Sequence, residues 1–407
     1  MNPVPHNIRK YVVLHKWVVL VGIALVLVSG VLVSLALRPI ADAAPRTTVA
    51  SVSVHEEPLK PELLWSPYGE QALAVVGSPT LVNNSGKNDK LPMASVAKVM
   101  TALALLQEKP LKPGEQGPSM TVTAQDVAVY ERELAQHQSV IAVRVGEQLT
   151  EYQIIEAMLV PSATNIADSA AVWAFGSVDA YLAKANAYAA SLGMTDSHFG
   201  GDASGFSPKS YSTPQDLIKL GTAAMAHPVI AEIVGKTSVY VPVAGTLHNF
   251  NINLGAEGIN GIKTGNTDEA GGTFLFSAPF HDRLIVGAIM GAPDLGTALH
   301  DSVEILRGFK STLQVHTLVT KNQKVGEYTL PWGEKINALA DSPISVLDWR
   351  GSRPAASAAL MPISADAQKG QKVGTVRVTH NGQILQADVL LERAASKPSI
   401  WWRIFHK

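Results

Sequence analysis

The most constraining feature of this sequence is an uncharged apolar run near its start. From Trp17 to Leu37, 21 consecutive residues carry no charge, and most of them are Val, Leu, Ile or Ala. A helix needs about 20 apolar residues to cross the hydrocarbon of a bilayer, so this run predicts a transmembrane helix over residues 17–37.

Charges around the run predict its orientation. Three cations precede it and one follows it closely: Arg9, Lys10, Lys16 and Arg38. This bias predicts a cytoplasmic tail over residues 1–16 and places everything after Leu37 outside the membrane. A cleaved signal peptide is the alternative, because Ala41-Asp42-Ala43 has the small-x-small form of a cleavage site and cleavage would give a secreted protein. The run exceeds the 7–15 residues usual in signal peptides, which favours an uncleaved signal anchor.

Composition excludes several functions. Charged residues make up 16% of the chain, the net charge is -1, and there is no cysteine. These values give no basic surplus for nucleic acid and exclude disulfides, thiol nucleophiles and thiolate metal sites. The 12 His residues show no metal-ligand spacing, so we expect no metal. Four acidic residues at helical positions are interpreted as solvated: Asp126, Glu131, Glu133 and Asp168.

The rest of the chain divides into a linker, a large domain, a small domain and a tail. Four prolines between residues 38 and 62 predict a linker. Within 63–314, strands are followed by an Ala-rich helical lobe, further strands and a closing amphipathic helix, which predicts an α/β domain whose sheet is built by both of its ends. Short β-prone runs separated by turns predict a small all-β domain over residues 316–395. The aromatic and basic tail, 396–407, suits either a membrane interface or packing on the β domain.

Ser95-Val96-Ala97-Lys98 carries the first candidate chemistry. On a helix, residues three apart share a face, so the Lys98 amine lies near the Ser95 hydroxyl. Burial among apolar neighbours lowers the pKa of a lysine, and a neutral amine can take the proton of a serine nucleophile. On its own this short motif is weak, because it occurs readily by chance.

Two further elements follow in order. Ser162, which is 67 residues later, is able to relay a proton to a leaving group, although a turn or cap is the simpler interpretation. Lys263-Thr264-Gly265 is predicted to end a strand over Ile259–Ile262. There the cation and hydroxyl suit an anionic carboxylate, and the glycine permits close backbone pairing.

In this order, the three elements resemble those of the penicillin-binding proteins and serine β-lactamases, and within that group the D-alanyl-D-alanine carboxypeptidases of low molecular mass. Flanking stretches support the likeness, among them Gly146–Thr150, Ser212–Leu217 and Gly261–Gly271, and it covers about residues 65–312. The resemblance implies a DD-peptidase fold, α/β (α+β), with a helical lobe beside the sheet. It also implies a bacterial cell-membrane location.

The resemblance also implies a mechanism without metal or cofactor. Ser95 would attack the carbonyl of the penultimate D-alanine of a peptidoglycan stem peptide, with Lys98 as base and Ser162 as proton relay. Lys263 and Thr264 would bind the terminal carboxylate, Gly265 would let the substrate backbone pair closely, and the backbone N–H groups of Ser95 and Asn266 would form the oxyanion hole. Penicillins and other β-lactams would acylate the same serine.

One position departs from the family pattern. The family usually has Ser-x-Asn, whereas this chain has Ser162-Ala163-Thr164, with Asn165 one place late. Either Thr164 takes the place of the amide, or a shifted loop turns Asn165 inward; the sequence leaves both alternatives open.

Two rival functions remain at this stage. A serine β-lactamase shares the first and third motifs but needs a well-placed glutamate for rapid deacylation, and the sequence identifies none. A non-catalytic cell-wall-binding scaffold is the alternative of another class, in which Thr164 marks decayed chemistry.

Overall fold

The computed structural model describes residues 6–48, 61–79, 82–351, 354–380 and 383–406. The chain divides into two compact units. One comprises residues 58–314 with 348–350, and the other comprises 1–57, 315–347 and 351–407. Each unit is described by itself.

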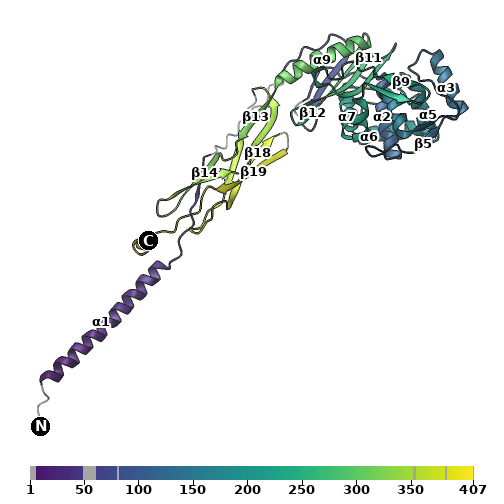
Figure 1. The fold of residues 1–407 in the computed structure, drawn as a ribbon. Helices are drawn as coiled ribbons and strands as arrows, with labels where there is room; N and C mark the ends of the chain where they lie inside the picture. Colours follow the sequence, from purple (N-terminus) through teal and green to yellow (C-terminus); the bar gives the residue numbers. More distant parts are fainter. Residues whose placement is uncertain (1–5, 49–60, 80–81, 352–353, 381–382, 407) are drawn as a thin grey trace. The chain divides into compact units, whose positions relative to one another are not determined.

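The first unit is built on a five-stranded antiparallel sheet with the order β10-β11-β12-β2-β3 (Figure 1). Its strands are β2 (Glu70–Val75), β3 (Val82–Asn84), β10 (Gly261–Thr267), β11 (Gly271–Phe280) and β12 (Arg283–Ala292). Strands from both ends of the unit therefore share one sheet, as the sequence predicted. Strands β2 and β3 are antiparallel neighbours in this sheet, and residues 80–81 between them lie outside the described part.

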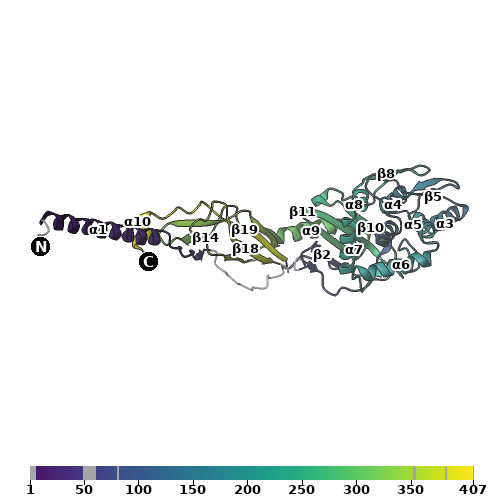
Figure 2. The ribbon, with the colours of Figure 1, turned by 90° about the horizontal axis from the view of Figure 1, so that it is seen from below.

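Helices cover both faces of this sheet. The closing helix α9 (Leu295–Thr312) packs on one face against β11 and β12, and α7 (Pro214–Ala226) packs against β2, β11 and β12. A Cβ at Gly221 of α7 would lie 2.8 Å from Val286 and 3.0 Å from Leu275, so this glycine lets α7 approach the sheet closely. Figure 2 shows the same layers from below.

The helical lobe surrounds α2 (Lys98–Glu108), which is buried from Lys98 to Leu106 and packs against several of the other helices. The rest of the lobe comprises η1 (Ala94–Ala97), α3 (Ala124–Ala135), α4 (Glu151–Leu159), α5 (Thr164–Phe175), α6 (Val178–Ser191) and α8 (Pro228–Val234), whereas η2 (Ala256–Gly258) packs against α9 and β11. Three short strand pairs complete it: β4 (Leu91–Pro92) with β7 (Tyr211–Ser212), β5 (Ser119–Thr121) with β6 (Gln148–Thr150), and β8 (Ser238–Val241) with β9 (Gly245–His248). Thr123 and Thr150 each begin a helix through a capping box, which satisfies the first backbone N–H groups.

Glu151, in the first turn of α4, is a buried carboxyl without a partner. Its side chain is fully inaccessible, and neither of its oxygens has a hydrogen bond within the described residues. Burial raises the pKa of Glu151 to about 7, and the charge of Lys109 opposes this shift. The pKa of Glu151 is higher in the folded state than in the unfolded state. The contribution of Glu151 to the free energy of unfolding is therefore fully present below about pH 4.5, and it is lost as the pH rises through about 7.

We therefore expect Glu151→Gln to remove this pH dependence. Between pH 5 and pH 8 the variant should gain roughly 2 kcal/mol of unfolding free energy relative to the parent. Thermal unfolding of the full chain in detergent micelles at both pH values measures the difference, and Glu131→Gln, at an exposed position of α3, is the control. An equal offset at the two pH values would contradict the expectation.

The second unit contains a six-stranded antiparallel sheet with the order β1-β14-β15-β19-β18-β17. Its strands are β1 (Pro45–Thr47), β14 (Lys324–Thr329), β15 (Lys335–Ala340), β17 (Ala356–Leu360), β18 (Lys372–His380) and β19 (Gln383–Leu391), and β13 (Leu313–Val319) pairs separately with β16 (Ile344–Trp349). Strands β18 and β19 pair antiparallel, in agreement with the all-β prediction for this region, and residues 381–382 between them lie outside the described part.

The expected linker over 38–62 needs a correction. Pro45–Thr47 pairs with Gly326–Tyr328 of β14, and Ala43 forms a bridge with Ile363. Residues 43–47 therefore belong to the β structure, because their backbone N–H and C=O groups pair with β14 and with Ile363. Residues 49–60 lie outside the described part.

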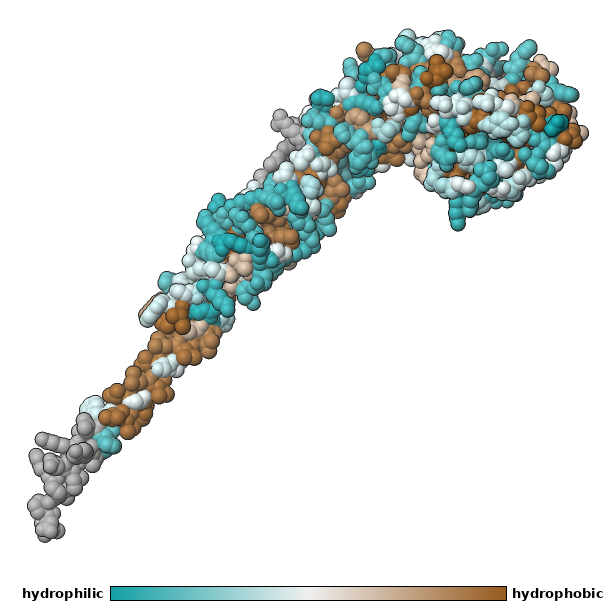
Figure 3. Space-filling model, in the orientation of Figure 1, coloured by the Kyte–Doolittle hydropathy of each residue, from teal (hydrophilic) through white to brown (hydrophobic). Residues whose placement is uncertain are grey.

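The second unit also contains α1 (His6–Ala36), and within it His15–Ala36 is long and apolar enough to cross a membrane. This stretch is brown along its length in Figure 3 and its side chains are mostly exposed. The tail forms α10 (Ile400–Phe405), where the Trp402 ring packs on Trp332 of the β unit and the Arg403 guanidinium donates to the Ala36 carbonyl at 2.8 Å.

Candidate active site

Ser95 and Lys98 lie at the junction of η1 and α2, where the helical lobe meets β10 of the sheet. The three-residue spacing puts both side chains on one face, and the Lys98 Nζ donates to the Ser95 Oγ at 2.7 Å. The same Nζ donates to the Ser204 carbonyl at 3.3 Å, which fixes the amine from a second side. A nucleophile and an adjacent base are therefore in direct contact.

The protonation of Lys98 is set by burial against nearby carboxylates. Burial of the whole side chain lowers the pKa of Lys98 to about 8, while the negative charges of Asp202, Asp168 and Glu133 oppose the shift. About a tenth of the amine is therefore neutral at pH 7, which is enough to accept the Ser95 proton.

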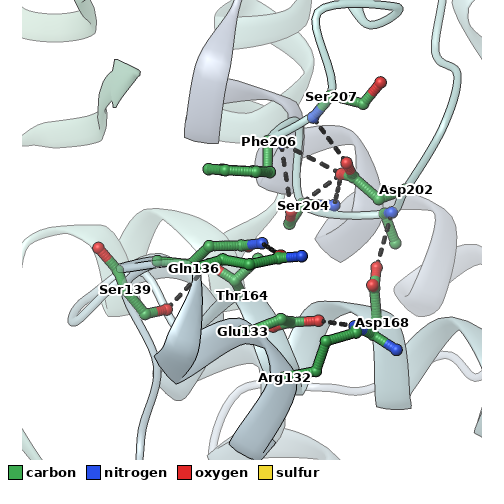
Figure 4. A network of polar contacts seen from close by, with 12 residues as sticks. Arg132, Glu133, Gln136, Ser139, Thr164, Asp168, Asp202, Ser204, Phe206 and Ser207 are labelled. Atoms are coloured by element: carbon green, nitrogen blue, oxygen red, sulfur yellow. Dashed lines mark hydrogen bonds and ion pairs between the residues drawn. The ribbon is translucent and has the colours of Figure 1, made fainter. Parts of the chain in front are cut away.

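A loop that carries Asp202–Ser207 forms one wall of the site (Figure 4). The Asp202 carboxylate accepts the backbone N–H groups of all four residues from 204 to 207, at 2.6–3.2 Å. Asp168 accepts the N–H of Ala203 at 2.8 Å. These bonds hold the Ser204 carbonyl toward Lys98. Asp202 was not predicted as a site residue. The signal in the sequence was an Asp that lies two residues before Ser204 and three before Gly205, a spacing typical of an Asx turn.

Gly205 brings this loop against the nucleophile. It has φ +78°, and a Cβ there would lie 2.1 Å from the Ala94 carbonyl oxygen and 2.6 Å from the Ala97 Cβ. No side chain fits, so the loop packs directly on the turn that carries Ser95. Ala94 itself has φ +45°, an uncommon value for a residue with a side chain, which is typical of strained functional turns.

The third motif lies inside an edge strand rather than beyond its end, as the sequence analysis had placed it. β10 begins at Gly261 and continues through Lys263, Thr264 and Gly265 to Thr267, paired on one side with β11. A Cβ at Gly265 would lie 2.9 Å from the Ala94 Cβ and 3.0 Å from the Ser95 N, so the missing side chain lets β10 lie against η1. The first and third motifs are thereby brought together.

Lys263 is buried, and its surroundings disfavour the charged form of its amine. Its Nζ donates to the carbonyl of Thr264 at 3.0 Å. Burial, together with repulsion from Lys98, lowers the pKa of Lys263 well below its usual range. An anionic group that enters beside this amine would restore its positive charge, so the site is suited to bind a carboxylate.

The second motif connects α4 to α5, and both of these helices pack against α2. Ser162 is 4% exposed and has φ +61°. Thr164 and Asn165 are both directed toward the loop after α3. The Thr164 N–H and Oγ1 donate to the Ser139 carbonyl at 2.7 and 2.9 Å, and the Asn165 amide exchanges two hydrogen bonds with the backbone of Ile141. Both side chains are therefore bonded to the backbone of the loop after α3.

Two of the acidic residues interpreted as solvated are not. Glu133 is 2% exposed, and Asp168 is bonded to the Ala203 N–H beside Lys98. Burial and the charge of Asp168 raise the pKa of Glu133 to about 7. Figure 4 shows both carboxyls with the Arg132 guanidinium, whose Nη2 lies 2.9 Å from the Glu133 Oε1. Helix α3 packs against α5, and in its last turn Glu133 is the buried residue. Of the other two acidic residues, Glu131 is exposed and Asp126 caps α3.

Comparison with known proteins decides the family. The sequence profile of the Peptidase_S11 family, D-alanyl-D-alanine carboxypeptidase, matches residues 77–294. The chain belongs to this family of serine-type DD-carboxypeptidases. The carboxypeptidase DacB2 of Mycobacterium tuberculosis is 32% identical over 226 residues, which cover 54% of this chain and 72% of the relative. DacF of Bacillus subtilis is 24% identical over 313 residues, 74% of this chain and 79% of DacF.

Solved structures of penicillin-binding proteins and DD-carboxypeptidases share the fold of this chain. Penicillin-binding protein 5 of Haemophilus influenzae superposes with a TM-score of 0.58 at 17% identity, over 83% of this chain and 99% of that protein. The D-alanyl-D-alanine carboxypeptidase of Mycobacterium tuberculosis gives 0.54 at 27% identity, over 61% and 93% of the two chains. The predicted fold class and the predicted class of enzyme are both confirmed.

Proposed function

We propose that this DD-carboxypeptidase removes the terminal D-alanine from peptidoglycan stem peptides through an acyl-enzyme on Ser95. The observation that carries the proposal is the contact of 2.7 Å between the Ser95 Oγ and the buried Lys98 Nζ, with Gly265 of β10 packed against the same serine. A nucleophile, a base and a carboxylate-binding strand are thus brought to one place.

The acylation step uses these groups in order. Neutral Lys98 takes the Ser95 proton while the Oγ attacks the carbonyl of the penultimate D-alanine. The backbone N–H groups of Ser95 and Asn266 stabilise the oxyanion, an effect worth about 2.7–4 kcal/mol per donor in enzymes of this kind. Collapse breaks the peptide bond, and the proton passes, with Ser162 as relay, to the departing D-alanine amine.

The rest of the site binds the leaving group and completes the cycle. Lys263 and Thr264 hold the terminal carboxylate, so a substrate that lacks it is bound weakly. Water then attacks the ester on Ser95, with Lys98 again as base, and releases the shortened peptide. A β-lactam ring presents a carbonyl and a carboxylate in a similar arrangement, and we expect it to acylate Ser95 without a departing D-alanine.

We also propose that α1 anchors the enzyme in the bacterial cell membrane. The support is the apolar stretch His15–Ala36 and the three cations Arg9, Lys10 and Lys16 at its N-terminal side, which favour a cytoplasmic N-terminus and an extracytoplasmic catalytic unit. N-terminal sequencing of the mature protein tests the anchor, since a start at Ala44 would show cleavage.

The function is tested by the release of free D-alanine from a peptide that ends in D-Ala-D-Ala. The full chain in detergent micelles should release D-alanine, whereas Ser95→Ala should release none, and neither should act on the same peptide ending in L-Ala-L-Ala. No release by the parent chain would reject the proposal in favour of a wall-binding role. Sustained hydrolysis of nitrocefin instead would identify a β-lactamase.

A further inference from the structure

Asp168, on α5, is bonded to the loop that orients the amine of Lys98. Its Oδ1 accepts the Ala203 N–H at 2.8 Å (Figure 4). The carbonyl of the next residue, Ser204, accepts a hydrogen bond from the Lys98 Nζ at 3.3 Å. Two consecutive loop residues therefore link the carboxylate to the amine.

Helix α2 holds the same stretch of the loop from another side. The Thr101 Oγ1 donates to the Ala203 carbonyl at 2.6 Å, and this hydroxyl shares a hydrogen bond of 2.8 Å with the Tyr181 hydroxyl. Both side chains are buried. Because the loop has these further bonds, a change in the charge of Asp168 that preserves its bond to Ala203 should leave the loop in place.

Three carboxyl groups and one amine surround Lys98 with charge. They are Asp202 on the loop, Asp168 on α5, Glu133 on α3 and Lys263 on β10. The carboxylates stabilise the protonated form of Lys98, whereas the amine of Lys263 destabilises it. A protonated amine cannot take the proton of the nucleophile, so each carboxylate restrains the base.

Asp168 differs from Asp202 in what its charge is needed for. The Asp202 carboxylate accepts four backbone N–H groups, which hold the loop together. Among the described residues Asp168 accepts one, from Ala203, and a neutral amide oxygen could accept it equally well. Burial raises the pKa of Asp168, against the Ala203 N–H and the positive charges of Lys98 and Arg132. The hydrogen bond explains the acceptor at this position but not its charge.

We propose that Asp168 is a positioning residue with two separable effects on the base. Its carboxylate orients the Lys98 amine through the Ala203–Ser204 peptide, and its negative charge holds the proton on that amine. This inference rests on the proposed function. Its consequence is that removal of the charge alone makes acylation faster at acidic pH, because a larger fraction of the amine is then neutral.

Asp168→Asn tests the charge, since the amide keeps an oxygen for the Ala203 N–H. The measured quantity is the second-order rate of acylation by benzylpenicillin, for the full chain in detergent micelles, as a function of pH. We expect the rising limb of the profile to move to lower pH by about 0.5–1 unit, which makes acylation at pH 6 about three- to tenfold faster. The plateau at high pH should change little.

Asp168→Leu tests the bond, because leucine removes both the charge and the acceptor. Asp168 lines a cavity of about 300 Å³ between α3 and α5, so the larger side chain has room. We expect the same shift of the limb, but a plateau about three- to tenfold lower, since the Ser204 carbonyl is held less firmly toward Lys98. A merely structural role would lower the plateau and leave the limb in place.

Asp216→Asn is the matched control. Asp216, on α7, is also a buried carboxylate that accepts a backbone N–H, that of Asp196 at 2.8 Å. The charges that act on Lys98 do not include it. Its substitution should leave the limb of the profile where the parent has it, so loss of a buried carboxylate in general is separated from the effect of Asp168.

Glu133→Gln supplies a second background for the same comparison. The charge of Asp168 helps to raise the pKa of Glu133, so Glu133 ionises more readily once that charge is gone and offsets part of the shift. With Gln at this position, Asp168→Asn should move the limb at least as far. A limb that stays in place in both backgrounds, or moves to higher pH, would overturn the inference. A parent chain that is acylated at no pH would reject the proposed function itself, and this inference with it.

Discussion

Replacing Lys98 by methionine is expected to lower the rate of acylation by benzylpenicillin about 10²–10⁴-fold, the usual contribution of a general base. The methionine side chain has a similar length and can pack where the buried lysine stem lies in α2, so the fold should persist. What is lost is the acceptor for the Ser95 proton. The rate is measured by the appearance of covalent adduct under conditions of excess antibiotic.

The pH profile separates loss of the base from general damage. In the parent, the pKa of Lys98 is about 8, so the acylation rate should rise about tenfold per pH unit below that value and level off above it. The methionine variant should lose this limb of the profile. A variant that keeps the same pH dependence at a lower rate would show that Lys98 is not the group that takes the proton.

Gly205→Ala is expected to abolish most activity although Gly205 touches no reacting atom. The new Cβ would lie 2.1 Å from the Ala94 carbonyl oxygen, and the backbone at φ +78° disfavours any side chain. Either the loop or the turn before Ser95 must move, which separates the Ser204 carbonyl from Lys98. We expect acylation at least 100-fold slower and a loss of about 2–3 kcal/mol in unfolding free energy.

Gly193→Ala is the matched control for the close contact. Gly193 also has a positive φ, +72°, but a Cβ there meets nothing within 4 Å. Its substitution should cost about 1 kcal/mol of stability and leave acylation close to the parent rate. Equal effects of the two substitutions would mean that backbone conformation, rather than the contact with Ala94, is what matters at Gly205.

The motifs were visible in the sequence because each combines a short spacing with a periodic element. Ser95 and Lys98 needed only the pitch of a helix to be brought into contact. The end of the strand at Lys263 was misplaced because Gly265 and Asn266 are typical of turns. In the structure Gly265 lies in an edge strand, where packing against η1 requires the absence of a side chain; no local pattern carries that information.

The electrostatic surroundings of Lys98 were the largest omission. Glu133 and Asp168 lie on different helices, and an acidic residue in an amphipathic pattern is most simply solvated. Only the packing of α3, α5 and the Asp202 loop around one amine makes them neighbours of Lys98. Similarly, β1 has three residues, too few for a period of two to be recognised, and its identity as a strand depends on β14.

The most direct test is the intact mass of the full chain after incubation with benzylpenicillin, followed by mapping of the modified peptide. We predict a mass increase by one antibiotic molecule, located on Ser95 and absent from Ser95→Ala. Prior incubation with a peptide ending in D-Ala-D-Ala should slow its formation. An adduct on another residue, or none at all, would contradict the assignment of Ser95 as the nucleophile.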